Sequence, residues 1–290
     1  MAILQILLAA CNSGTGASNN FERFREERRR LVEETTARLS ADEGGRVMLK
    51  AIEAHGGLEA WFRTRSSVSL WEYHRLPAGR SFTSRLMGER SGQRVYQELQ
   101  YFDAAGAKTG SGRFGWDGKE GWLEMEGAIS RADRLRHRAA ATFYLERVPF
   151  IFALQNIRYE LLPPEDLDGA PKDRIRISIT GGVGDARFIV YIDQLTGRVS
   201  AVRYAFPTES PEAGIDSLRN GLLRYNEFFT VDGLTLPIRM TLYPVENEIP
   251  GDATYQAVCR EITFREFFDQ SALKRPDGAI LLSENGLEDR

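Results

Sequence analysis

A two-residue alternation of apolar and polar side chains recurs through most of this 290-residue chain, from about residue 66 to residue 267. In the segment 234–243, apolar residues at even positions alternate with polar ones such as Arg239 and Thr241. Successive side chains point to opposite faces of a strand, so this pattern predicts a strand with one buried face. About a dozen such segments are separated by turn sequences, as at 193–197 and 231–233. Strands joined by tight turns pair antiparallel, and a sheet this large must curl or close to protect its edges.

Three further segments have helical patterns. Residues 21–40 interleave acidic and basic side chains at helical spacing, which predicts a solvated helix crossed by ion pairs. A second helix at about 45–55 ends at Gly56, because glycine accepts the left-handed conformation of a helix C-cap. The aromatic-rich insertion at about 128–155 is expected to cover the concave face of the sheet. The predicted fold class is α+β, mainly β, with residues 21–285 forming one domain.

The first eleven residues have the pattern of a lipoprotein export signal. An apolar run ends in Leu8-Ala9-Ala10-Cys11, and a small, polar stretch follows. In bacterial lipoproteins such a cysteine becomes the acylated N-terminus. We therefore expect residues 1–10 to be a signal peptide, Cys11 to carry acyl chains such as palmitate, and residues 11–20 to be a flexible tether. The alternative is an ordinary apolar strand or helix, since no Lys or Arg precedes Cys11.

Residue Asn12 bears on the location of such a lipoprotein. In some bacteria an aspartate after the acylated cysteine holds lipoproteins at the inner membrane, and this chain has Asn12 instead. The sequence thus favours the outer membrane, with the domain facing the periplasm and Cys11 as its contact with the membrane.

Charge and motif content argue against several function classes. The net charge of −3 does not favour a nucleic-acid partner. The three histidines, His55, His74 and His137, are not at metal-ligand spacing from another ligand-type residue. The glycines at 181–184 lie between two predicted strands, where a phosphate-binding loop would need a helix. We expect no metal, no cofactor and no catalytic residue, although an envelope hydrolase with a site assembled from distant strands stays open.

Aromatic residues concentrate in the early strands and in the insertion. A packed core explains each of them singly. A half-open β structure under a helical cover can also leave an apolar cavity for an acyl chain or another elongated hydrophobe. The candidate cavity residues are Trp71, Phe82, Trp116, Trp122, Phe143, Tyr144, Phe150, Phe152, Ile238 and Met240.

Several segments resemble the LolA/LolB-type superfamily of bacterial periplasmic and outer-membrane lipoproteins. They are 51–61 (AIEAHGGLEAW), the hairpin 114–122, Phe143-Tyr144 with Pro149-Phe150, 191–197 and 231–237. The resemblance implies one antiparallel sheet of about eleven strands, curled into a half-open barrel whose mouth is closed by helices. In the better-known members the cavity binds acyl chains of lipoproteins in transit, but no ligand-contacting residue of those proteins can be matched to a position in this chain.

Together these features predict a lipid-anchored envelope protein, monomeric, that binds or transfers a lipid, an acyl chain or a lipoprotein in an apolar half-barrel cavity. Two alternatives remain open. One is a structural or interaction lipoprotein whose barrel is filled by side chains. The other is the envelope hydrolase.

Overall fold

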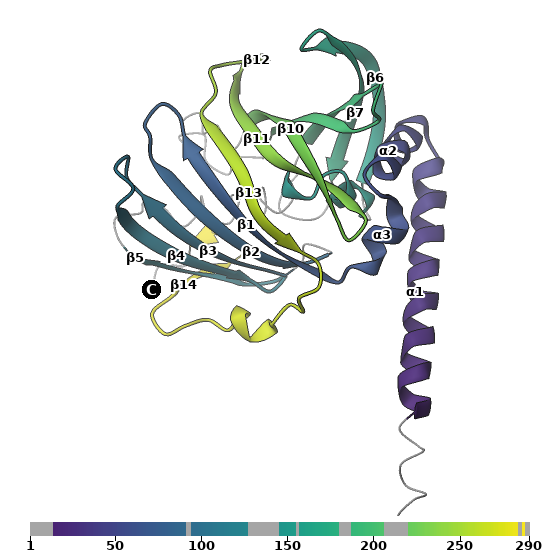
Figure 1. Cartoon of the computed structure of the whole chain (residues 1–290), viewed down its shortest axis with the longest axis horizontal. Helices are drawn as coiled ribbons and strands as arrows, with labels where there is room; N and C mark the ends of the chain where they lie inside the picture. The colour runs from purple at the N-terminus through teal and green to yellow at the C-terminus, as the bar shows by residue number, and fades with distance from the viewer. Residues whose placement is uncertain are drawn as a thin grey trace, which may run out of the picture.

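One antiparallel sheet runs through the described part of the chain and curls towards the helices (Figure 1). The computed structural model describes residues 14–90, 94–126, 145–154, 157–179, 187–205, 220–283 and 286–287. The helices are α1 (Gly14–Ser40), α2 (Glu43–Ala54) and α3 (Gly57–Arg63), with two 3-10 turns, η1 (Phe150–Ala153) and η2 (Gln270–Leu273). The strands are β1 (Ser66–Arg75), β2 (Ser81–Glu89), β3 (Val95–Phe102), β4 (Lys108–Trp116), β5 (Gly121–Glu126), β6 (Ile157–Leu167), β7 (Ala170–Ile179), β8 (Arg187–Asp193), β9 (Val199–Ala205), β10 (Asn220–Val231), β11 (Leu234–Glu246), β12 (Ile249–Pro250), β13 (Tyr255–Thr263), β14 (Ile280–Ser283) and β15 (Gly286–Leu287).

The strand order is β15-β14-β5-β4-β3-β2-β1-β13-β11-β10-β9-β8-β7-β6, with β12 paired to β11. Strand β13 lies between β1 and β11, so it joins a first half-sheet, β1–β5, to a second, β6–β11 (Figure 1). Within the described residues the outermost strands, β6 and β15, do not pair with each other, so the sheet stays open. The predicted curled antiparallel sheet is confirmed. It has more strands than the expected eleven because short strands such as β14 and β15 extend one edge.

Helix α2 begins where the side chain of Asp42 caps its first turn. Oδ1 of Asp42 accepts a hydrogen bond of 2.6 Å from the backbone N–H of Gly45, which satisfies a donor that the helix itself cannot. The next residues bury Met48, Ala51 and Ile52, which lie three and four positions apart and so share one face. This face packs into the main core, and α2 contacts β6 and β7.

The end of α2 is tied to the sheet by His55, which is fully buried. Its Nδ1 donates a 2.7 Å hydrogen bond to the carbonyl of Thr235 on β11, and its Nε2 accepts one of 3.1 Å from the N–H of Val199 on β9. Gly56 follows with φ of 116°, and a Cβ at this position would lie 2.0 Å from the carbonyl oxygen of Gly233. Glycine therefore ends the helix as predicted, and His55 has a structural role, joining α2 to β9 and β11.

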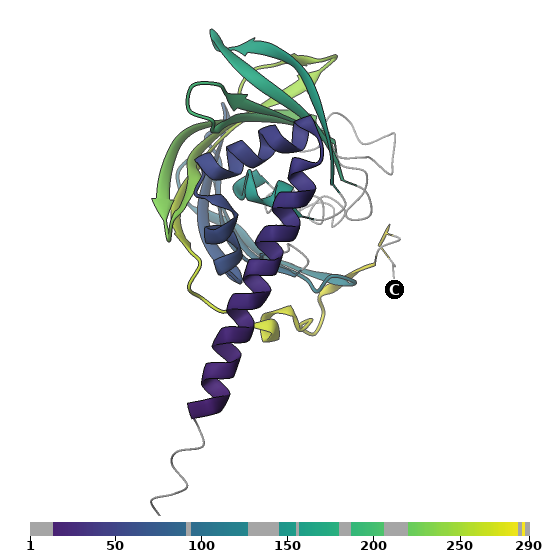
Figure 2. The ribbon, with the colours of Figure 1, turned by 90° about the vertical axis from the view of Figure 1, so that its right-hand side faces the viewer.

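Helix α1 packs against α2 and α3 with its C-terminal half, while its N-terminal half projects away from the sheet (Figure 2). Leu39 is fully buried in the core, and the partly buried Leu31 packs against the core. The helix begins at Gly14, so residues 14–20, which we expected in the tether, form its first turns. Cys11 and the expected signal peptide lie outside the described residues. No helix in the described ranges has the length and apolar character needed to span a bilayer.

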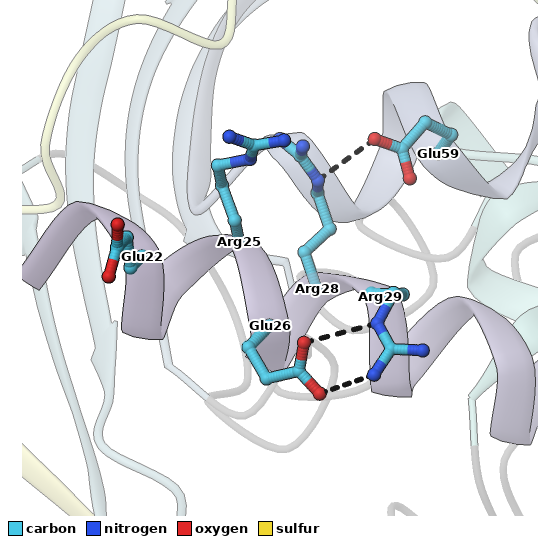
Figure 3. Close-up of a pocket in the computed structure, with 6 residues that line it drawn as sticks. All are labelled: Glu22, Arg25, Glu26, Arg28, Arg29 and Glu59. Atoms are coloured by element: carbon cyan, nitrogen blue, oxygen red, sulfur yellow. Dashed lines mark hydrogen bonds and ion pairs between the residues drawn. The ribbon is translucent and has the colours of Figure 1, made fainter.

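Ion pairs run along α1 and connect it to α3 (Figure 3). Arg29 bonds Glu26 over 3.1 Å and Glu33 over 2.8 Å, one turn away in each direction. Nε of Arg28 lies 2.9 Å from Oε1 of Glu59 on α3. Exposed pairs of this kind contribute little free energy, so the apolar contacts of the C-terminal half hold α1 in place. The pairs are those expected from the alternating charges of 21–40.

Candidate ligand-binding site on the concave face

Strands β1–β5 direct an apolar surface towards the inside of the curl. Antiparallel pairing sets Tyr73 opposite Phe82, and Phe82 opposite Tyr101, and directly opposed residues share a face of the sheet. Trp71, two positions before Tyr73, lies on the same face and is fully buried. Trp116 is half-buried and packs against the same group of side chains. Three predicted cavity residues, Trp71, Phe82 and Trp116, are therefore brought to one face.

Four buried residues form an apolar floor on this face, which we call the rim cluster: Phe82, Leu99, Phe114 and Leu123. Tyr73 stacks on Phe82, with ring centroids 4.5 Å apart and planes inclined by 3°. Offset stacking of this kind adds about 0.5–1.5 kcal/mol to the free energy of apolar burial. The rim cluster is distinct from the main core, which extends from β6 across to Val95 of β3.

A pocket of about 440 Å³, which we call the rim pocket, opens at the edge of the rim cluster. Its walls include Phe82, Tyr101 and Tyr255, and the ring of Phe82 lies 5.8 Å from that of Tyr101 and 6.4 Å from that of Tyr255. Arg75 and Arg80 complete its lining at the β1–β2 turn. Its volume is within the range of small-molecule sites, roughly 300–1,000 Å³.

Residues 145–154, which we call the plug, lie inside the curl of the sheet. Figure 2 shows the short helix η1 of the plug, in teal, between the sheet and α1. Phe150 stacks on Trp61 of α3 at 5.0 Å, and Phe152 meets Phe188 of β8 edge-on at 5.3 Å. Both plug phenylalanines are completely buried. We expected Phe150 and Phe152 to line a cavity; instead Phe150 packs the plug against α3, and Phe152 packs it against the second half-sheet.

A buried ion pair connects the plug to the first half-sheet. Glu146 accepts hydrogen bonds from the hydroxyls of Ser69 (2.9 Å) and Tyr73 (3.0 Å) on β1. Nε of Arg147 donates to Oγ of Ser67 over 2.9 Å, and its Nη1 lies 3.6 Å from Oε2 of Glu146. Burial raises the pKa of Glu146 to about 7, although Arg147 acts in the opposite direction. Burial lowers the pKa of Arg147 in turn.

Our sequence reasoning did not identify this pair. The available signal was the occurrence of two adjacent charges, Glu146 and Arg147, inside an otherwise apolar run from 143 to 154. It also missed Arg75, Arg80 and Tyr255. Arg75 and Arg80 flank the Pro-Ala-Gly turn at 77–79, and the two ends of a hairpin turn must lie close together.

The structure does not bring every predicted cavity residue to the concave face. Trp122 lies on the opposite face from its neighbour Leu123, and its indole N–H donates a 2.7 Å hydrogen bond to the carbonyl of Leu273 in η2. Met240 does lie on the concave face, because it pairs with Ala257 and Ala257 pairs with Tyr73, and it is buried in the main core, whereas Ile238 is only half-buried. The pairing of β10 with β11 shifts register next to Ile238, which interrupts the alternation on which its assignment rested. Phe143 and Tyr144 lie outside the described residues.

Cys259 lies beside the buried ion pair, directly opposite Trp71 in the β1–β13 pairing. Burial raises the pKa of its thiol to about 12, and the charge of Glu146 acts in the same direction. A thiol with this pKa is almost entirely protonated at neutral pH, and the thiolate is the reactive form. Cys259 is therefore unsuited to nucleophilic chemistry in this position.

Comparison with known proteins identifies the fold. No family model and no curated protein sequence matches the chain. Among solved structures, the LolA superfamily protein NE2245 from Nitrosomonas europaea has a TM-score of 0.50 and 12% identity, over 81% of this chain and 99% of that one. A DUF1329 family protein from Desulfovibrio piger (TM-score 0.47, 12% identity, 81% of this chain and 98% of that one) and a putative outer membrane lipoprotein-sorting protein domain from Vibrio parahaemolyticus (0.45, 12%, 79% and 94%) are also similar. The similarity to the first protein shows that this chain has a LolA-like fold, as the resemblance implied.

Proposed function

We propose that this protein is a lipid-anchored component of a bacterial cell envelope that binds a hydrophobic ligand, a lipid or an acyl chain, on the concave face of its sheet. The observation that carries the proposal is the rim pocket, whose aromatic walls stand on the buried rim cluster. Within the described residues, the plug contributes no side chain to this cluster. The resemblance to the LolA/LolB-type superfamily, whose better-known members bind acyl chains, also supports a lipid or an acyl chain as the ligand.

The experiment that tests ligand binding is mass spectrometry of lipids that copurify with the full chain under native conditions. We expect an acyl-chain lipid to copurify with the wild type, and much less with Phe82→Ala. Tyr191→Ala is the matched control, because Tyr191 is a buried aromatic residue in the separate apolar cluster of the second half-sheet. Absence of lipid from the wild type, or equal loss from both variants, would contradict the proposal.

The proposed anchor is Cys11, which we place in the outer membrane with the domain facing the periplasm. The projecting N-terminal half of α1 supports this arrangement, since it would hold the sheet away from the bilayer (Figure 2). Labelling with a radioactive fatty acid tests it. We expect label in the wild type and in Cys259→Ala, and none in Cys11→Ala. Label that persists in Cys11→Ala would contradict Cys11 as the acylated residue.

The plug favours a second candidate function, an interaction lipoprotein whose half-barrel is filled. Phe152 is buried against Phe188 of the second half-sheet and Phe150 is buried against Trp61 of α3, as residues of a filling segment would be. This candidate predicts that neither the wild type nor the Phe82→Ala variant carries lipid. The copurification experiment therefore separates the two functions.

A further inference from the structure

We propose that the rim pocket selects acyl chains that end in a single anionic group, such as the carboxylate of a fatty acid or the phosphate of a lysophospholipid. This inference rests on the proposed function and adds the chemistry of the head group. It follows from the arginines at the pocket, from the hydrogen bonds that its acidic side chain already accepts, and from the position of its aromatic rings.

Two arginines at the rim pocket are available to an anion. Arg75 and Arg80 are adjacent across the β1–β2 turn, where the N–H of Arg75 donates a 2.8 Å hydrogen bond to the carbonyl of Arg80. Both are exposed, and neither has an ion-pair partner in the part of the chain that the structure describes. A guanidinium group can bind a carboxylate or a phosphate through two parallel hydrogen bonds. An incoming anion would therefore not have to displace an existing partner.

The acidic residue of the pocket, Asp103, is occupied by its own turn. Its Oδ1 accepts hydrogen bonds of 2.9 Å from the backbone N–H groups of Ala105 and Ala107, and so shapes the β3–β4 turn. Among the described residues that line the pocket, two positive charges stand against this one negative charge, so this lining is cationic. The local field thus favours an anionic ligand over a neutral or cationic one.

The aromatic rings supply the second half of the recognition. Tyr101 and Tyr255 stand on either side of Phe82, which itself stacks on Tyr73. An acyl chain would cover these rings while its head group stays at the exposed arginines. A small hydrophilic anion would leave the rings unused, and a neutral chain would leave the arginines unused, so an anionic amphiphile matches both parts of the pocket.

The test is calorimetric titration of the full chain with decanoate, decyl phosphate and 1-decanol, which share one alkyl chain. We expect both anions to bind at least about tenfold more tightly than the alcohol, the effect of one charge-assisted hydrogen bond. The double variant R75Q/R80Q should lose this preference and keep its affinity for decanol. Arg113→Gln, which removes an exposed arginine of β4 paired with Glu124, should bind all three probes as the wild type does. Asp103→Asn keeps the turn acceptor and should tighten binding of the anions only.

The results of these titrations test the head-group inference and the proposed function separately. Equal affinity for decanol and the anions, or an unchanged preference in R75Q/R80Q, would overturn the head-group inference and leave the proposed function standing. Failure of all three probes to bind would contradict the proposed function itself. A stronger response to decanoate would indicate a fatty acid as the source of the anion, and a stronger response to decyl phosphate would indicate a phospholipid head group.

Discussion

The hydroxyl group of Tyr73 donates a 3.0 Å hydrogen bond to Oε1 of Glu146, while the ring of Tyr73 stacks on Phe82 in the wall of the rim pocket. One side chain of β1 therefore touches both the buried ion pair of the plug and the candidate ligand site. A change in the charge of Glu146 acts directly on a neighbour of the pocket.

We expect the titration of Glu146 to lower the stability of the protein as the pH rises. The pKa of this carboxyl is about 7 in the folded protein against an ordinary value of 4.5, so between these values the folded state binds more protons than the unfolded state. The contribution of Glu146 to the free energy of unfolding is therefore full below about pH 4.5 and falls as the pH rises towards 7, with a limiting slope of about 1.4 kcal/mol per pH unit. Urea unfolding of the wild type and of Glu146→Gln across this window measures it. The free energy of unfolding of the wild type, measured relative to that of Glu146→Gln, should fall as the pH rises through this window, and a difference that does not change with pH would contradict the assignment.

The titration of His55 should act in the opposite direction. Burial lowers the pKa of His55 to about 4, below its ordinary value of 6.5, so in this window the unfolded state binds more protons. The contribution of His55 is full above about pH 6.5 and is lost as the pH falls towards 4. Its slope opposes that of Glu146 where the windows overlap, so the wild type should be nearly independent of pH between about 4.5 and 6.5. A steeper fall with rising pH in His55→Ala would reveal the Glu146 slope alone.

The same His55→Ala variant should lose stability at neutral pH. Removal of the imidazole leaves the carbonyl of Thr235 and the N–H of Val199 buried without a partner, at a cost of about 1–3 kcal/mol each. His74→Ala is the control, because His74 is partly exposed on β1 and, among the described residues, its ring bonds the side chain of Glu72. Equal unfolding free energies for the two variants would contradict the role assigned to His55.

We expect Gly56→Ala to destabilise the protein far more than Gly106→Ala. Both glycines have positive φ, 116° and 85°, so a side chain is strained at either position. A methyl group at Gly56 would also overlap the carbonyl of Gly233, whereas no atom lies within 4 Å of the corresponding position at Gly106. The cost should be about 1–2 kcal/mol at Gly106 and more than about 3 kcal/mol at Gly56. Thermal unfolding of the two variants checks the difference.

Truncation of Phe150 should test how firmly the plug is held. Phe150→Ala removes the ring that stacks on Trp61 and leaves a cavity between the plug and α3, at a cost of about 3–5 kcal/mol. Leu195→Ala, at a turn residue that is 94% exposed, should change the free energy of unfolding by less than about 0.5 kcal/mol. A cost near that of Leu195→Ala would show that the plug contributes little to the folded state.

Much of the fold could be predicted because its determinants are local. The alternation in 234–243 and the turn signals at 193–197 and 231–233 indicate strands and hairpins without knowledge of their neighbours. Gly56 ends α2 because the preference of glycine for positive φ does not depend on the rest of the chain.

Other features depended on contacts between distant segments. The alternation that marks β13 as a strand does not say that it pairs with β1 on one side and β11 on the other. Trp122, which we expected at the cavity, and its neighbour Leu123 lie on opposite faces of β5, and only Leu123 faces the inside of the curl, because the register assigns the faces and η2 covers Trp122.

The sequence by itself therefore determined an antiparallel sheet, its turns and the residue at which α2 ends, because periodicity and backbone preference act over a few residues. Only the tertiary structure decided which aromatic residues share a face, and only it joined Glu146 of the plug to Tyr73 of β1, 73 residues apart. Burial and pairing are properties of the assembled sheet. The same is true of the rim pocket, whose arginines and rings come from four strands and the turns between them.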